Sequence, residues 1–185
     1  MFINICKVFL FYLLLSFLPV FAIETTQLKG IELTQPPIDL EMVNRIWLIL
    51  KKETGAADNV PYPPIVLDWE VPKTALMGTQ YPTKEFPDNR LQISLAPRTL
   101  DQLDHQMLLF GIGHELTHYL FLLRENDWDP QKKYYVATRL HHCDPEFQRI
   151  MRVIVDIIWN TYHDDAMRNQ LAYEPRRSCV LNPNQ

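Results

Sequence analysis

The sequence lacks an excess of positive charge, which limits the partners that it can have. Its 185 residues include 18 Lys and Arg against 22 Asp and Glu, a formal net charge of −4. Nucleic-acid binding requires a basic stripe, and a membrane-surface helix requires a cationic amphipathic stretch. Neither is present in the sequence, so we expect no nucleic-acid partner and no helix lying on a membrane surface.

Charge is almost absent from residues 1–22, where Lys7 is the only charged side chain. An apolar run from Val8 to Phe21 follows, and Val20-Phe21-Ala22 resembles a signal-peptidase site. This layout predicts a secretory signal peptide. The alternative is an uncleaved membrane anchor, but a membrane-spanning helix needs about 20 apolar residues and this run is shorter. We therefore expect one exported domain, periplasmic or secreted, over residues 23–185, with 17 basic and 22 acidic residues and a formal charge of −5.

Cysteine is also scarce. Of the three cysteines, Cys6 lies in the signal segment, which leaves Cys143 and Cys179. Two cysteines in an exported chain can form one disulfide, and two idle thiols are the other simple interpretation. A catalytic pair of Cys143 with His141 or His142 is the weaker interpretation, because the sequence shows no group that would orient the imidazole.

Periodicity predicts the elements of the N-terminal half. Apolar residues recur at three- and four-residue steps from Ile38 to about Glu53, and Gly55 follows, so this segment predicts an amphipathic helix. Residues 54–98 hold seven of the fourteen prolines, which excludes a long helix. We expect strands at Ile65–Leu67 and at Arg90–Leu95, where apolar and polar residues alternate, and loop elsewhere in this segment.

The C-terminal half reads as helical. Thr99 to Arg124 is apolar almost all round, which predicts a central, buried helix. Asp129-Pro130 predicts the start of a helix to about Leu140, and Asp144-Pro145 the start of another to about Met167. The expected fold is therefore an α+β domain with an N-terminal helix, a small antiparallel or mixed sheet, a central helix and C-terminal helices.

The central helix carries the motif H-E-x-x-H in His114, Glu115 and His118. Residues four apart share one helix face, so two imidazoles at this spacing can converge on one zinc ion at about 2.0–2.1 Å. Glu115 lies one step round the helix, beside the metal, where it can accept a proton from a metal-bound water whose pKa falls to roughly 7. This spacing and these residue types suit metal-assisted hydrolysis.

The surroundings of the motif support a metal. Two imidazoles and a carboxylate interrupt a helix that is otherwise too apolar to face water, and burying them without partners would cost several kcal/mol. Gly111 and Gly113 each disfavour a helix by about 1 kcal/mol relative to Ala. They predict a place where another backbone packs close to the helix.

A third protein ligand must come from elsewhere, because the extended form H-E-x-x-H-x-x-G-x-x-H is absent. Phe121 stands where its glycine would be, and Arg124 where its third histidine would be. The downstream candidates are His141, His142, Asp144, Asp156 and His163. Asp144 reads as an N-cap, and Asp156 and His163 as solvated groups, so we choose His142 as the ligand, with His141 as its close rival.

With these elements and residues, the sequence resembles the SprT-like (Spartan-like) minimal zincins. The order is a helix, short strands, the strand Leu91–Leu95, the H-E-x-x-H helix, and then a histidine before Pro145-Glu146-Phe147. In that family the third histidine precedes a G-P-E-F type helix start; here Asp144 stands in place of the glycine, and Cys143 separates it from the histidine. The match covers roughly residues 38–160, and it implies a zincin-like fold with zinc as cofactor.

The function expected from these residues is that of a monomeric, exported zinc metallopeptidase acting on a peptide or protein substrate. Glu115 would be the general base, and the strand at 90–95 would offer its edge to an extended peptide. Tyr134, Tyr135 and Tyr162 are possible donors to the oxyanion, although each also reads as a packing aromatic.

Two other functions compete with this one. In a secreted binding domain with a structural zinc, a fourth ligand from His141, His142 or Cys143 would close the site, and Glu115 would have no use. In a secreted binding protein with a metal-free site, the buried ionisable residues would be unexplained.

Overall fold

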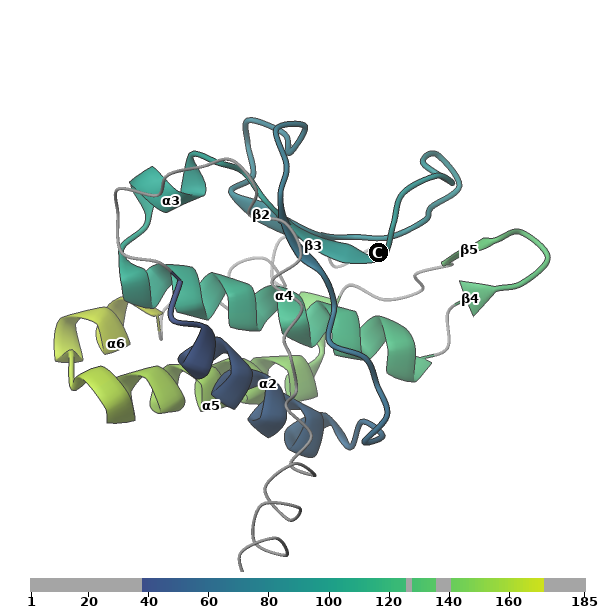
Figure 1. Cartoon of the computed structure of the whole chain (residues 1–185). Helices are drawn as coiled ribbons and strands as arrows, with labels where there is room; N and C mark the ends of the chain where they lie inside the picture. Colours follow the sequence, from purple (N-terminus) through teal and green to yellow (C-terminus); the bar gives the residue numbers. More distant parts are fainter. Residues whose placement is uncertain (1–37, 126–127, 136–140, 172–185) are drawn as a thin grey trace, which may run out of the picture. The chain divides into compact units, whose positions relative to one another are not determined.

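The computed structural model describes residues 38–125, 128–135 and 141–171, which form helices and short strands. In chain order the elements are α2 (Leu40–Thr54), β1 (Ile65–Leu67), β2 (Met77–Gln80), β3 (Gln92–Leu95), α3 (Thr99–Gln102), α4 (His105–Glu125), β4 (Trp128–Asp129), β5 (Tyr134–Tyr135), η1 (His141–Cys143), α5 (Pro145–Tyr162) and α6 (Asp165–Leu171). This composition confirms the expected α+β class (Figure 1). The predicted signal peptide, residues 1–22, and Cys179 lie outside the described residues.

α2 is the helix that the N-terminal apolar pattern predicts. It begins after Asp39, whose Oδ1 accepts the N–H of Met42 at 2.9 Å, as an N-cap does. It ends at Gly55, whose φ of +66° is a left-handed conformation that glycine adopts without strain. The inner face is buried, namely at Met42, Val43, Ile46, Trp47 and Leu50.

A mixed sheet of three strands, in the order β1-β3-β2, lies beside the helices. β3 is parallel to β1 and antiparallel to β2, so Ile93 has Ile65 on one side and Thr79 on the other. The expectation that the strand at 90–95 offers an edge is therefore wrong, because both of its sides are paired. β2 is an outer strand of this sheet, although the sequence predicts loop there.

α4 is the central helix, as its apolar sequence predicts. It contacts β2 and β3 on one side and α2 and α5 on the other (Figure 1). Its fully buried apolar side chains are Leu109, Ile112, Leu116, Leu120, Phe121 and Leu122. Polar groups on such a helix are withdrawn from bulk water, so each needs a partner. Among the described residues, no helix combines the length and the apolar composition that a membrane crossing requires.

The helix predicted to run from Thr99 to Arg124 is interrupted near its start. α3 ends at Gln102, and Leu103 is extended, with φ −104° and ψ 136°. Asp104 then accepts the N–H of Met107 at 2.9 Å, which supplies the cap of α4. The aspartate side chain competes with helical backbone hydrogen bonding at this position, and the helix restarts after it.

The prediction of a helix over Asp129 to Leu140 is wrong for the residues that the structure describes. Residues 129–135 belong to the hairpin β4–β5. Oδ1 of Asp129 accepts the N–H groups of Gln131 and Lys132 at 2.9 and 3.1 Å, and thereby closes a turn. Lys133 continues the turn at φ +59°. The rings of Trp128 and Tyr135 then pack across the two strands, with centroids 5.1 Å apart. The Asp-Pro pair therefore opens a turn here and not a helix.

The helix predicted over Asp144 to Met167 is two helices in the structure. Asp144 caps α5 as expected, since its Oδ1 accepts the N–H of Glu146 at 2.8 Å. His163 ends α5 in a left-handed conformation, with φ 55°, and donates its N–H to the carbonyl of Trp159. α6 follows at Asp165.

The side chain of Ile154 on α5 is fully buried and lies beside Gly113 of α4 and near Ile46 of α2. We expect Ile154→Ala to lower the free energy of unfolding by about 2–4 kcal/mol, because truncation leaves a cavity among three helices. Arg152 is exposed on the same helix, so Arg152→Ala is the matched control and is expected to change stability by less than about 0.5 kcal/mol. Urea denaturation measures both; equal effects would contradict this packing.

Candidate metal centre

His114 and His118 lie one turn apart on α4 and face the same way. Their Nε2 atoms are 3.1 Å apart, and their ring centroids are 4.8 Å apart. Both side chains are partly buried. The spacing of the motif thus produces the convergence of imidazole nitrogens that the sequence predicts.

The third histidine comes from η1, the short turn that precedes α5. His142 Nε2 lies 3.0 Å from that of His114 and 2.9 Å from that of His118. Phe147, in the first turn of α5, is only 2% exposed and packs against all three rings. The centroid distances from Phe147 are 5.3 Å to His114, 4.6 Å to His118 and 5.5 Å to His142. One aromatic side chain therefore supports the whole cluster.

This cluster fits a metal ion. Each Nε2 separation of 2.9–3.1 Å is smaller than twice a zinc–nitrogen distance of about 2.0–2.1 Å, so one ion can reach all three nitrogens. Within the described ranges, these are the only three His, Cys, Asp or Glu side chains that converge in this way. Three neutral imidazoles are a donor set that suits zinc and leaves a further position open.

Burial sets the charge of His114. It lowers the pKa of His114 to about 4, with a smaller contribution from the neighbouring His142. His114 is therefore neutral at pH 7, which is the form in which an imidazole binds a metal.

Glu115 is buried beside the histidines, with only 8% of its surface exposed. Its Oε2 accepts two hydrogen bonds from Thr79 of β2, one from the backbone N–H at 2.7 Å and one from the hydroxyl at 2.8 Å. Burial raises the pKa of the Glu115 carboxyl, and the hydrogen bonds from Thr79 offset part of that rise. A carboxylate with a raised pKa is a stronger base than an exposed one.

The glycines of α4 explain how β2 reaches Glu115. A Cβ atom on Gly111 would lie 2.6 Å from the sulfur of Met77, so β2 approaches the helix closely at this point. Two strand residues span about 6.6–6.8 Å and four helix residues about 6 Å. Thr79, two residues after Met77, is therefore level with Glu115, four residues after Gly111. The sequence predicts a backbone neighbour at Gly111 and Gly113, but the neighbouring atoms are side chains.

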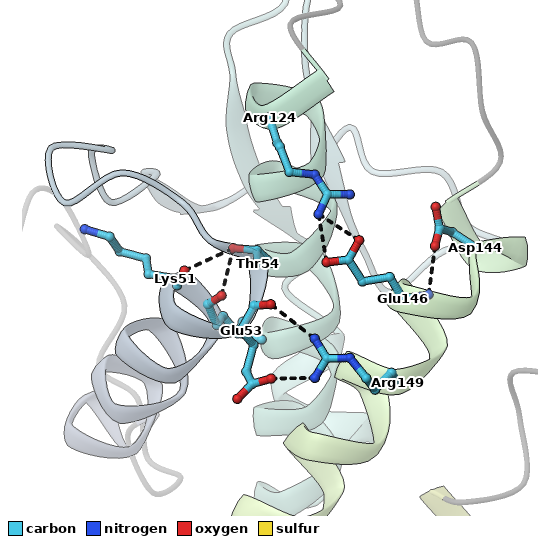
Figure 2. Close-up of polar contacts among 8 residues, drawn as sticks. Lys51, Glu53, Thr54, Arg124, Asp144, Glu146 and Arg149 are labelled. Atoms are coloured by element: carbon cyan, nitrogen blue, oxygen red, sulfur yellow. Dashed lines mark hydrogen bonds and ion pairs between the residues drawn. The ribbon is translucent and has the colours of Figure 1, made fainter.

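Several polar contacts hold the start of α5, and with it His142, against α2 and α4. Figure 2 shows Arg124 of α4 reaching Glu146, with both carboxylate oxygens 2.8 Å from Nη1. Arg149 pairs with Glu53 at the end of α2 in the same view. These pairs are partly exposed, so each adds little stability by itself. Gln148 adds a bond from Nε2 to the carbonyl of His142, at 3.2 Å.

Three other candidate ligands are used elsewhere in the structure, as the sequence suggests. Asp144 is the N-cap of α5, Asp156 pairs with Arg168 at 3.1 Å, and His163 ends α5. The side chain of His141, the rival of His142, lies outside what the structure describes.

Of the predicted oxyanion donors, one is engaged elsewhere. The hydroxyl of Tyr162 lies 2.9 Å from His105 Nε2 and donates to Asp39 at 3.2 Å. Tyr134 and Tyr135 form β5, and the ring of Tyr135 packs on Trp128 and Tyr81. The packing interpretation therefore fits Tyr135 and Tyr162.

The comparisons with known proteins add no relative. Neither the models of protein families, nor curated proteins, nor solved structures match this chain. We therefore infer a function from the geometry of the cluster.

We expect the protein to bind one zinc ion, and His114→Ala, His118→Ala and His142→Ala each to weaken that binding by more than about 100-fold. This exceeds the 10- to 100-fold that loss of an outer-shell partner costs, because a direct ligand is removed. His141→Ala is the matched control and is expected to change the affinity by less than about threefold. Competition with a chromogenic chelator measures all four. A loss of zinc affinity in His141→Ala, with His142→Ala unaffected, would show that His141 and not His142 is the third ligand.

Proposed function

We propose that this chain is an exported zinc metallopeptidase of the SprT-like minimal zincin type, monomeric and acting on peptides or unfolded proteins. One observation carries the proposal: three imidazole nitrogens within 3.1 Å of one another lie beside a buried glutamate from the same helix. Export rests on the predicted signal peptide over residues 1–22.

The chemistry follows from the residues of the cluster. When bound to the three histidines, zinc would polarise the substrate carbonyl and lower the pKa of a bound water to about 7. Glu115 takes the proton of the attacking water and passes it to the leaving amine. Its burial favours this role, because few waters compete for the carboxylate.

The sheet supports a peptide substrate. β2 lies along α4, where Thr79 contacts Glu115 of the motif, and it pairs with β3 on its inner side. Within the described residues no strand pairs with its outer side. An extended peptide can add to such an edge through backbone hydrogen bonds other than that of the Thr79 N–H, which donates to Glu115, and its carbonyl groups would then lie close to the cluster. We therefore assign to β2 the role that the sequence suggests for residues 90–95.

Glu115→Gln is expected to abolish proteolysis, with at least about a 1,000-fold loss of kcat/KM, while zinc content stays at one per chain. The amide keeps the shape of the side chain but cannot accept the proton of the water, and general-base catalysis contributes roughly 10²–10⁴-fold. The assay is cleavage of an unfolded protein by the purified, zinc-loaded protein.

Glu41→Gln is the control, since Glu41 is an exposed acid in the first turn of α2. It should leave activity unchanged. A Glu115→Gln variant that keeps both zinc and full activity would refute the general-base role. Absence of hydrolysis by a wild-type protein that holds zinc would instead favour a structural zinc site in a binding domain.

A further inference from the structure

The backbone N–H of Thr79 points away from β3, the strand with which β2 pairs. Its partner in β3, Ile93, donates its N–H to the carbonyl of Pro64, on the β1 side. In an antiparallel ladder, the residue opposite such a group belongs to a non-hydrogen-bonded pair and directs its own N–H outward. The N–H of Thr79 is therefore not used by the sheet, and it donates to Glu115 on α4.

Thr79 donates hydrogen bonds to only one of the two carboxylate oxygens of Glu115. Both its N–H and its hydroxyl donate to Oε2 of Glu115. Oε1 makes no hydrogen bond within the described part of the chain, and it is not among the fully buried polar atoms. The two oxygens of Glu115 are thus different: Oε2 is anchored, and Oε1 is accessible for a proton.

The hydroxyl of Thr79 also lies 2.9 Å from the backbone carbonyl of Glu115. A hydroxyl has one proton, so it donates to one of these two acceptors at a time. Both acceptors belong to the same residue, and the contact therefore ties β2 to Glu115 whichever of them is used. A bond to the ionised carboxylate is the stronger of the two.

We propose that Thr79 is the positioning residue of Glu115, and that its hydroxyl and N–H hold Oε2 so that Oε1 is the oxygen that accepts the proton. This inference rests on the proposed function. It gives β2 a second role, since the strand beside the substrate also orients the base. A base displaced by about 1 Å loses much of its efficiency, so the anchor acts on the chemical step.

Thr79→Val removes the hydroxyl and keeps the β-branched shape that suits a strand. We expect it to lower kcat roughly 10- to 100-fold, the factor that corresponds to loss of a hydrogen bond to a charged group. KM and zinc content should change by less than about threefold, because neither the edge of β2 nor the histidines are altered. Thr79→Ser, which restores the hydroxyl, should recover kcat to within about threefold.

Thr54→Val is the matched control. Thr54 is a buried threonine whose hydroxyl donates to the carbonyl of Leu50 at 2.8 Å, at the end of α2 and outside the cluster. It should leave kcat unchanged. If Thr79→Val does not fold, Thr79→Ala removes the same hydroxyl with a smaller group and takes its place.

Equal kcat for wild type and Thr79→Val would overturn the proposal, as would an equal loss in Thr79→Ser or a loss of zinc that accounts for the lost activity. Crystal structures of the zinc-loaded wild type and Thr79→Val give a readout that does not depend on activity. A Glu115 side chain that changes rotamer in the variant supports the proposal, and one that keeps its position contradicts it. If the wild type hydrolyses nothing, the proposed function fails, and these structures alone decide the role of Thr79.

Discussion

The structure depends on how α4 buries three ionisable side chains. α4 lies between the sheet and two helices, and its apolar residues form the core on both sides. A carboxylate or an imidazole in such a place is costly unless it has a partner. Glu115 obtains its partner from β2, through Thr79. His114 and His118 meet His142 and share Phe147 as a packing surface. A metal ion would complete the cluster, because the three ring nitrogens would then donate their lone pairs to one cation.

Two connections far apart in the sequence converge on this helix. β2 comes from the proline-rich segment, and the close approach of Met77 to Gly111 places Thr79 level with Glu115. His142 comes from η1, and the capped and ion-paired start of α5 holds that turn in place. The base and the third histidine are therefore positioned by different elements, and the rest of the core serves to keep both against α4.

The sequence predicts part of this arrangement, and the limits have physical causes. The four-residue spacing of His114 and His118 is a local property of a helix, so their convergence follows from the motif. Thr79 could not be found in this way, since β2 has no alternating pattern and its contact with Glu115 spans 36 positions in the sequence.

The differences between the predicted and the observed helices have local causes. Asp129-Pro130 suits a helix start as well as a turn. The packing of Trp128 on Tyr135, which is not visible in the sequence, accompanies the turn. Leu103 and His163 interrupt predicted helices because a neighbouring aspartate, Asp104 or Asp164, caps a new helix.

X-ray absorption at the zinc edge of the zinc-loaded protein tests the three-histidine site most directly. The structure predicts nitrogen and oxygen neighbours at about 2.0–2.1 Å, with the scattering signature of three imidazoles and no sulfur. A sulfur neighbour at about 2.3 Å would place a cysteine on the metal and close the site. That result, or a fourth imidazole, would contradict a catalytic centre built from His114, His118 and His142.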